Sequence, residues 1–202
     1  AVNVALPSIS KELQMNSVTL NWVALSFSLA MAILILPFGR LADIIGRKKL
    51  LLCGMSVFTL ASALCGISIS PAMLIASRVL QGMSGATISV TVVSILTSTY
   101  PPGERGKVLG LNVAMTYIGL SSGPFLGGLF TEYMGWRSIF LTIIPIGAAI
   151  VILLSCLKQD WAEAAGEKFD YVGSGIYGVS LLGIIWGFSI IRSSWGPVMV
   201  II

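Results

Sequence analysis

The sequence predicts an all-α, polytopic bundle of transmembrane helices, and three observations support this prediction. Hydrophobic residues make up 56% of the 202 positions and charged residues only 10%, whereas soluble domains contain about 45–50% and about 25%. Mean hydropathy is +0.96. The few charged residues divide the chain into long neutral runs. A soluble fold of this size could not cover its surface with so few charges.

Six of these neutral runs have the length of membrane-spanning helices. A helix that crosses about 30 Å of hydrocarbon needs about 20 residues. Because lipid offers no partners to backbone polar groups, such segments must satisfy them internally as helices. The runs also lack the alternating polarity of transmembrane β-strands. They cover residues 13–39, 50–77, 79–103, 108–131, 138–157 and 171–191.

Both ends of the chain predict that it is a fragment of a longer protein. Residues 1–10 have the character of the outer end of one more span, but they are too short to cross alone. No initiator Met and no basic leader segment precede them. The chain stops within the apolar stretch 197–202. We therefore expect about seven spans, the first of them truncated, with a C-terminal half missing.

The distribution of positive charge predicts the orientation in the membrane. The side that follows Gly39 carries eight Lys and Arg residues and the other side three, so the first side is expected to be cytoplasmic. The protein is thus predicted to be a multi-pass protein of the plasma membrane. The eight are Arg40, Arg47, Lys48, Lys49, Arg105, Lys107, Lys158 and Lys168, and the three are Lys11, Arg137 and Arg192.

Several function classes are disfavoured by composition. The chain has no His, and no Asp or Glu lies inside a neutral run, so we expect no metal site, no cofactor and no enzymatic activity. No basic run suggests nucleic-acid binding. Cys53, Cys65 and Cys156 lie in apolar runs and are interpreted as small buried hydrophobic residues.

The segment between the first two long runs reads GRLADIIGRKK. Gly39 and Gly46 permit a tight reversal. Asp43 is placed to cap a helix or to pair with the neighbouring cations. Arg47 and Lys48 would hold this end in the cytoplasm. From the residues alone, a turn with orienting charges explains the segment without any further role.

Two other segments carry candidate functional residues. Arg78 lies in an otherwise neutral stretch, where a charge costs about 3 kcal/mol on insertion scales, and Gln81 and Gly82 follow one turn later. Snorkelling of Arg78 is the simpler alternative. A second segment has small residues every four positions, which lets helices approach closely, and its proline bends the helix. A packing face without any further role explains this segment equally well. It contains Gly119, Gly123, Pro124, Gly127 and Gly128.

These patterns resemble the major facilitator superfamily of transporters. The GRLADIIGRKK segment is similar to its signature loop, which implies a cytoplasmic gating latch in which Asp43 and Arg47 engage the opposite half. R-x-x-Q-G-x-x-x-A resembles the fourth-span motif, which implies proton coupling through Arg78. G-x-x-x-G-P-x-x-G-G resembles the antiporter motif of drug/proton exchangers, which implies a seam that limits leakage. NVALP and GWRSIF resemble further segments of that branch, and Trp136 is expected to be an interfacial anchor.

The resemblance also implies a domain organisation. Residues 1–157 would form the N-terminal six-helix half, with span one incomplete. Residues 158–202 would form a cytoplasmic linker, an additional span and the start of the next segment. The short linker and the sequence FDYVG resemble the fourteen-span branch of drug/proton antiporters (EmrB/QacA type). A twelve-span protein with a short linker is the alternative.

The function implied is secondary active transport by alternating access, with export of small lipophilic or cationic organic compounds in exchange for protons. The proton gradient would be the energy source, and protons, lipid and the missing half would be the partners. A transporter of one metabolite or peptide is the alternative, and a non-transporting membrane sensor is a more distant one. The proton-carrying carboxylate is not visible in this part of the protein.

Overall fold

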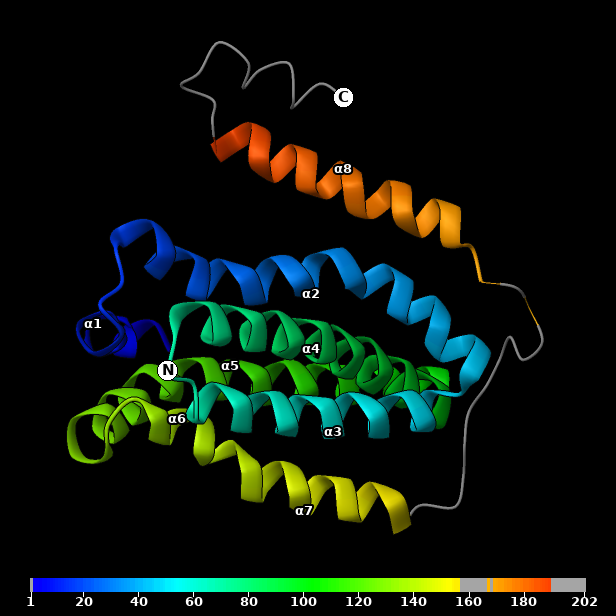
Figure 1. Cartoon of the computed structure of the whole chain (residues 1–202). Coiled ribbons are helices and arrows are strands. Elements are labelled where there is room, and N and C mark those ends of the chain that lie inside the picture. Colours follow the sequence, from blue (N-terminus) through cyan, green and yellow to red (C-terminus); the bar gives the residue numbers. More distant parts are fainter. Residues whose placement is uncertain (1, 157–166, 168, 190–202) are drawn as a thin grey trace.

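Figure 1 shows the computed structural model, a bundle of helices that lie roughly side by side. It describes residues 2–156, 167 and 169–189. Five stretches are long and apolar enough to cross a membrane, in agreement with the first five neutral runs. They are α2 (Ser17–Ile45), α3 (Arg47–Gly66), α4 (Pro71–Thr99), α5 (Pro102–Met134) and the pair α6 (Arg137–Leu141) and α7 (Ile143–Cys156).

The two ends of the described chain are helical as well. The predicted truncated span forms α1 (Val2–Leu13), and the sixth neutral run forms α8 (Tyr171–Ser189). Within α8 the stretch Tyr171–Ile184 is apolar but shorter than a full span. Most of the expected linker lies outside the described residues, as do Lys158, Lys168 and Arg192.

Polar side chains and prolines mark where the helices begin. Asn16 accepts a hydrogen bond from the Thr19 amide at the start of α2, and Ser70 accepts one from Met73 at the start of α4. Pro102 occupies the first turn of α5, where its missing N–H costs no helical hydrogen bond. These caps stabilise ends that would otherwise leave amides unpaired.

The run 138–157 was expected to be one helix, but it is interrupted at Thr142. Pro145 explains the position of the break. Its ring would clash with the carbonyl of residue 141, and it cannot donate the corresponding hydrogen bond. The Thr142 amide bonds to the Ser138 carbonyl at 2.9 Å, at the end of α6.

Helix α4 lies between α2 and α3 and contacts both closely (Figure 1). On the α3 side, a Cβ atom added to Gly54 would come within 2.9 Å of the Thr87 side chain. Helices α2, α3 and α4 therefore form a tight core, and the candidate site described below lies within it.

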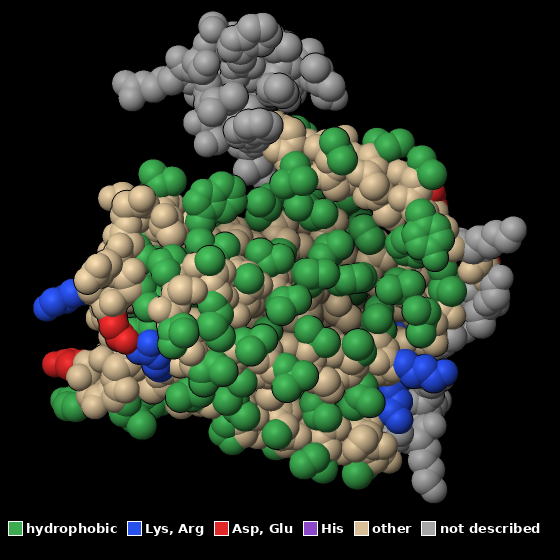
Figure 2. Space-filling view, viewed as in Figure 1, with side chains coloured by type: hydrophobic (Ala, Val, Ile, Leu, Met, Phe, Trp, Pro, Cys, Tyr) green, Lys and Arg blue, Asp and Glu red, His purple; other side chains and the backbone are tan. Residues whose placement is uncertain are grey.

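The outer surface of the bundle is apolar in the middle and charged at the ends. Figure 2 shows hydrophobic side chains over most of the visible face, with Lys, Arg, Asp and Glu toward its two ends. Leu36, Phe125 and Ile152 are more than 60% exposed. This distribution suits a molecule surrounded by lipid.

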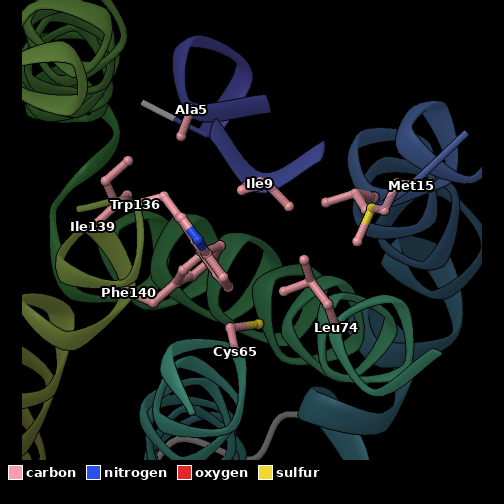
Figure 3. Packing of buried hydrophobic residues seen from close by; sticks show 9 residues of the cluster. Ala5, Ile9, Met15, Cys65, Leu74, Trp136, Ile139 and Phe140 are labelled. Atoms are coloured by element: carbon pink, nitrogen blue, oxygen red, sulfur yellow. The ribbon is translucent and has the colours of Figure 1, made fainter. Parts of the chain in front are cut away.

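A second packed region lies where α1, α3, α4 and α6 meet at the outer end of the bundle. Figure 3 shows eight labelled members of this outer cluster, with Trp136 and Phe140 directed toward α1 and α3. The two rings pack edge to face, 6.2 Å between centroids. The outer cluster comprises Ala5, Ile9, Met15, Val23, Cys65, Leu74, Trp136, Ile139 and Phe140.

Candidate functional site

Arg78 is buried in the first part of α4, against α2. Its side chain does not snorkel outward: the residue is 9% exposed. Its Nε donates to the Val23 carbonyl of α2 at 3.1 Å. The guanidinium carbon lies 4.4 Å from the centre of the Phe27 ring, in a cation–π arrangement.

Gln81 connects Arg78 to α3. The Arg78 Nη1 donates to Gln81 Oε1 at 2.8 Å, and Gln81 Nε2 donates to the Ser62 hydroxyl at 2.7 Å. The Cys65 thiol approaches the same Gln81 oxygen at 3.6 Å. Gln81 is 1% exposed, so its amide has no access to solvent. The result is a continuous buried polar chain through three helices.

Gly82 lies at a close approach of α2 and α4. An added Cβ atom would collide with the Phe27 carbonyl oxygen and would lie 2.8 Å from the Ala30 side chain. Only glycine fits here without displacing backbone. Gly82 therefore allows the approach that brings Arg78 within reach of Val23.

Arg78 has no carboxylate partner among the described residues. The hydrogen-bond partners of its guanidinium are a backbone carbonyl and an amide, both neutral. Neutral dipoles and an aromatic face compensate a buried charge less completely than an ion pair does. The arrangement can hold a fixed positive charge inside the bundle, and it can bias the proton affinity of a carboxylate brought near it.

The segment predicted to be cytoplasmic is organised around Arg47. Its Nη2 and Nε donate to Asp43 Oδ1 at 2.8 and 3.0 Å, and its Nη1 donates to the Ser94 carbonyl of α4 at 3.3 Å. Of the two roles considered for Asp43, pairing is the one observed, because α3 has no side-chain cap. Arg47 is 5% exposed and ties the start of α3 to α4.

The expectation that both Gly39 and Gly46 form the turn is wrong for Gly39. Gly46 alone connects α2 and α3, with φ of 117°, a value that favours glycine. Gly39 lies inside α2, because residues 40–45 contain neither proline nor glycine and continue the helix to Ile45. Lys48 lies in the first turn of α3 and is half-buried.

The glycines of α5 are not gathered with Arg78. An added Cβ at Gly119 meets no atom within 4 Å among the described residues. Gly127 is buried, and the Cβ position of Gly128 lies 3.7 Å from Val4 of α1. Gly123 is half-buried, and Pro124 lies within the continuous helix α5. The outer end of the predicted seam thus packs on α1.

One group of residues escaped the sequence-based prediction. Glu12 at the end of α1 accepts a hydrogen bond from Trp136 Nε1 at 2.7 Å and pairs with Arg137. Arg137 also donates to the Ser68 carbonyl at 3.0 Å and lies over the Trp136 ring. The hydrogen bond from Arg137, followed by that from Trp136, lowers the pKa of Glu12. In the sequence, Glu12 and Arg137 are visible only as charged residues at the borders of two neutral runs, and nothing there indicates that they pair.

Trp136 does not contact lipid as an interfacial anchor was expected to, because the residue is only 2% exposed. Its ring is covered by Phe140 and by α1, and its N–H is used by Glu12. A GWR segment predicts an aromatic residue near the membrane surface. The segment could not reveal that a neighbouring helix covers that residue.

An apolar cavity of about 350 Å³ lies among α2, α3, α4 and α7, next to the Arg78 site. Phe27 and Met31 line it. Met115 and Tyr117 do not; they lie on α5 with 59% and 64% of their surface exposed. Phe27 therefore borders both the cavity and the guanidinium of Arg78.

The described residues contain no group of three or more side chains that could hold a metal ion. Among the same residues, the buried side-chain nitrogen and oxygen atoms all have hydrogen-bond partners except the hydroxyl of Ser26. Within this part of the chain, the structure offers a buried cation, dipoles and apolar surface. These groups are suited to binding and conformational change.

The sequence profile described as Major Facilitator Superfamily matches residues 1–202. The chain is 36% identical over 186 residues to multidrug resistance protein Stp of Mycobacterium tuberculosis, covering 92% of this chain and 35% of that protein. It is 36% identical over 206 residues to the cephamycin export protein CmcT of Amycolatopsis lactamdurans, covering 98% and 42%.

A third relative is the riboflavin transporter RibZ of Clostridioides difficile, which is 34% identical over 173 residues and matches 85% of this chain and 38% of its own length. The chain thus spans 35% of the length of Stp, 42% of that of CmcT and 38% of that of RibZ.

Proposed function

This chain belongs to the Major Facilitator Superfamily, and from that premise we propose that it forms part of a secondary active transporter that exports small lipophilic or cationic organic compounds in exchange for protons. It is a multi-pass membrane protein, and we place it in the plasma membrane. Relatives named for multidrug resistance and for cephamycin export support the direction of transport.

The observation that carries the proposal is the buried guanidinium of Arg78. A guanidinium keeps its proton at working pH, so Arg78 is not itself the proton carrier. In the proposed mechanism it lowers the proton affinity of a carboxylate that approaches it, and withdrawal of Arg78 restores that affinity. The carboxylate would come from a part of the protein outside this chain. The proton gradient supplies the energy, with no cofactor and no enzymatic step.

The proposed conformational cycle is alternating access, in which two helical halves rock around a site near the midplane. The Asp43–Arg47 pair, anchored to Ser94, would form this half's part of the cytoplasmic gate. The glycines of α5, from Gly119 to Gly128, would form the antiporter seam. The matching half would come from the C-terminal part of the same protein.

We propose the same domain organisation as above, with residues 1–157 as the N-terminal half and 158–202 as linker, additional span and start of the next segment. Helix α8 begins directly after the short linker, and this supports a total of fourteen spans in the whole protein. Asp170 supports this reading locally, because its carboxylate accepts a hydrogen bond from Gly173 and caps the start of α8.

A transporter for one metabolite is the second candidate, and the similarity to a protein named as a riboflavin transporter favours it specifically. The apolar lining of the cavity around Phe27 and Met31 favours varied lipophilic compounds instead. A site for one polar metabolite would need several polar groups that converge on the ligand.

The deciding experiment is an efflux assay on the complete gene product. Cells that express it are loaded with a panel of cationic dyes, or with radiolabelled riboflavin, and export is followed with and without a protonophore. The proposal expects export of several unrelated dyes, and the protonophore should abolish it. Export of riboflavin alone would establish the metabolite transporter instead. Dye export that persists after collapse of the gradient would refute the coupling to protons.

A further inference from the structure

Three hydrogen bonds run in one direction from Arg78 on α4 into α3, and a fourth runs from Arg78 to α2. The Ser62 hydroxyl donates to the Phe58 carbonyl at 2.7 Å, and Gln81 Nε2 donates to the Ser62 oxygen at 2.7 Å. Arg78 Nη1 donates to Gln81 Oε1 at 2.8 Å, and its Nε donates to the Val23 carbonyl at 3.1 Å. Ser62 is 0% exposed and Gln81 1%, so water does not reach their side chains.

The direction of this chain follows from donor and acceptor chemistry. A guanidinium only donates, so the oxygen of the Gln81 amide must face Arg78. The NH₂ group of Gln81 must then face Ser62, whose oxygen accepts from it. The hydroxyl proton of Ser62 consequently goes to Phe58, a carbonyl that only accepts. A rotated amide would place NH₂ against the donors of Arg78, so the arrangement has one consistent state.

The chain fixes the plane of the Arg78 guanidinium. Two of its nitrogens are tied, one to α2 through Val23 and one to α3 through Gln81 and Ser62. The guanidinium carbon lies 4.4 Å from the centre of the Phe27 ring, and Phe27 also lines the apolar cavity. Release of the Gln81 end would leave the guanidinium free to turn about its remaining bond to Val23.

We propose that Ser62, through Gln81, is a positioning residue for Arg78, and that it sets how strongly the proton gradient drives transport. The inference rests on the proposed function, because it assigns Ser62 a part in proton coupling. The sequence motif contains Arg78 and Gln81 but not Ser62. Ser62 is one of many serines in the apolar runs, and its role became identifiable only from its contact with Gln81.

The test uses Ser62→Ala in the full-length transporter, with Ser56→Ala as the matched control. Ser56 lies on the same helix and its hydroxyl makes the same kind of bond, to the Leu52 carbonyl at 2.9 Å, but it contacts neither Gln81 nor Arg78. Ser62→Thr keeps the hydroxyl and serves as the conservative variant. Loss of the hydroxyl leaves the buried NH₂ of Gln81 without its acceptor.

The first readout is transport in proteoliposomes with a cationic dye. Ser62→Ala should reduce uptake driven by an imposed pH gradient about tenfold, the effect of one lost hydrogen bond. Exchange of dye across the membrane at equal pH should keep its rate, because the positioned charge matters only for the proton step. Ser56→Ala should match the wild type, and Ser62→Thr should restore most of the gradient-driven uptake. A purely structural defect would lower both rates together.

The second readout does not depend on transport. Cys65 is 0% exposed and its thiol contacts Gln81, so its alkylation by a small maleimide reports loosening of the chain. In a background with Cys53 and Cys156 changed to Ser, Ser62→Ala should raise the alkylation rate about tenfold, and Ser56→Ala should not.

The outcomes separate the two proposals. Equal gradient-driven uptake in Ser62→Ala and the wild type overturns the positioning role, whatever Cys65 shows. If the wild type itself moves dye without responding to a pH gradient, the proposed antiport fails. The positioning inference is then decided by Cys65 alone, and equal alkylation rates in Ser62→Ala and the wild type overturn it.

Discussion

The indole nitrogen of Trp136 donates a 2.7 Å hydrogen bond to the carboxylate of Glu12, although 124 positions separate the two residues. Arg137 pairs with the other oxygen of the same carboxylate. One acidic side chain thereby joins the end of α1 to the start of α6. The contact covers the outer cluster, in which Cys65 and Phe140 are fully or almost fully buried.

Glu12→Gln should lower the thermal stability of the purified protein by about 2–4 °C, because a charge-assisted contact becomes a neutral one. The pKa of Glu12 is lowered in the folded state, so the carboxylate stabilises the fold fully above its ordinary pKa of 4.5. That contribution disappears as the pH falls through the lowered value. The difference in Tm between wild type and Glu12→Gln should therefore be constant from pH 7 to pH 5 and shrink below. A difference that grew on acidification would contradict the assignment.

Gly82→Ala should destabilise the bundle by about 1–3 kcal/mol, the usual cost of overpacking. The added methyl group would collide with a backbone oxygen of Phe27, which cannot move without displacing α2. Gly110→Ala on α5 is the matched control, because a Cβ there meets nothing within 4 Å among the described residues. The control should be neutral or slightly stabilising. Thermal unfolding in detergent measures both, and equal Tm values for the two variants would show that α2 and α4 are not closely packed.

Arg78→Ala should abolish proton-driven export in the full-length protein while expression stays intact. Arg78→Lys keeps the charge but cannot reproduce the separate bonds of Nε and Nη1, so it should restore only part of the activity. Dye efflux from energised cells measures both variants, with membrane-fraction immunoblots to normalise the amount of protein. Full efflux in Arg78→Ala would eliminate the coupling role.

Gly123→Leu should stop export without preventing folding. Gly123 is half-buried, and a Cβ added to Gly119, one turn earlier on α5, meets no atom within 4 Å among the described residues. The expected block arises when another helix approaches the seam during the cycle. Gly110→Leu, elsewhere on the same helix, is the control. Normal efflux in Gly123→Leu, at equal amounts of folded protein, would exclude a transport role for the seam.

The bundle itself was predictable because spacing between charges follows directly from the thickness of a bilayer. Each neutral run up to 131 contains most of one helix, from α2 to α5 in order, and Gly46 became the turn that its pattern indicated. Local chemistry also accounts for the two departures. Residues 40–45 favour helix over turn, which moved Gly39 into α2, and Pro145 interrupts the helix near Thr142.

The contacts of the site were not predictable to the same extent. Arg78 and Gln81 are three residues apart and follow from helical geometry. Their partners Val23 and Ser62 belong to other helices, and nothing in the sequence around them marks the contact. For the same reason Trp136 was expected at the lipid surface. A single sequence reveals which helix faces can pack, but it does not reveal which face packs against which.

The connection at Gly46 has a mechanical consequence. A 29-residue helix and a 20-residue helix share a joint of one residue, and the Asp43–Arg47 ion pair bridges that joint from one rod to the other. A connection of one residue leaves little freedom between the two helices. A tilt of α2 would therefore either tilt α3 as well or break the Asp43–Arg47 ion pair. Because both helices are long and meet at one residue, a small displacement of their connected ends would produce a larger displacement at their far ends.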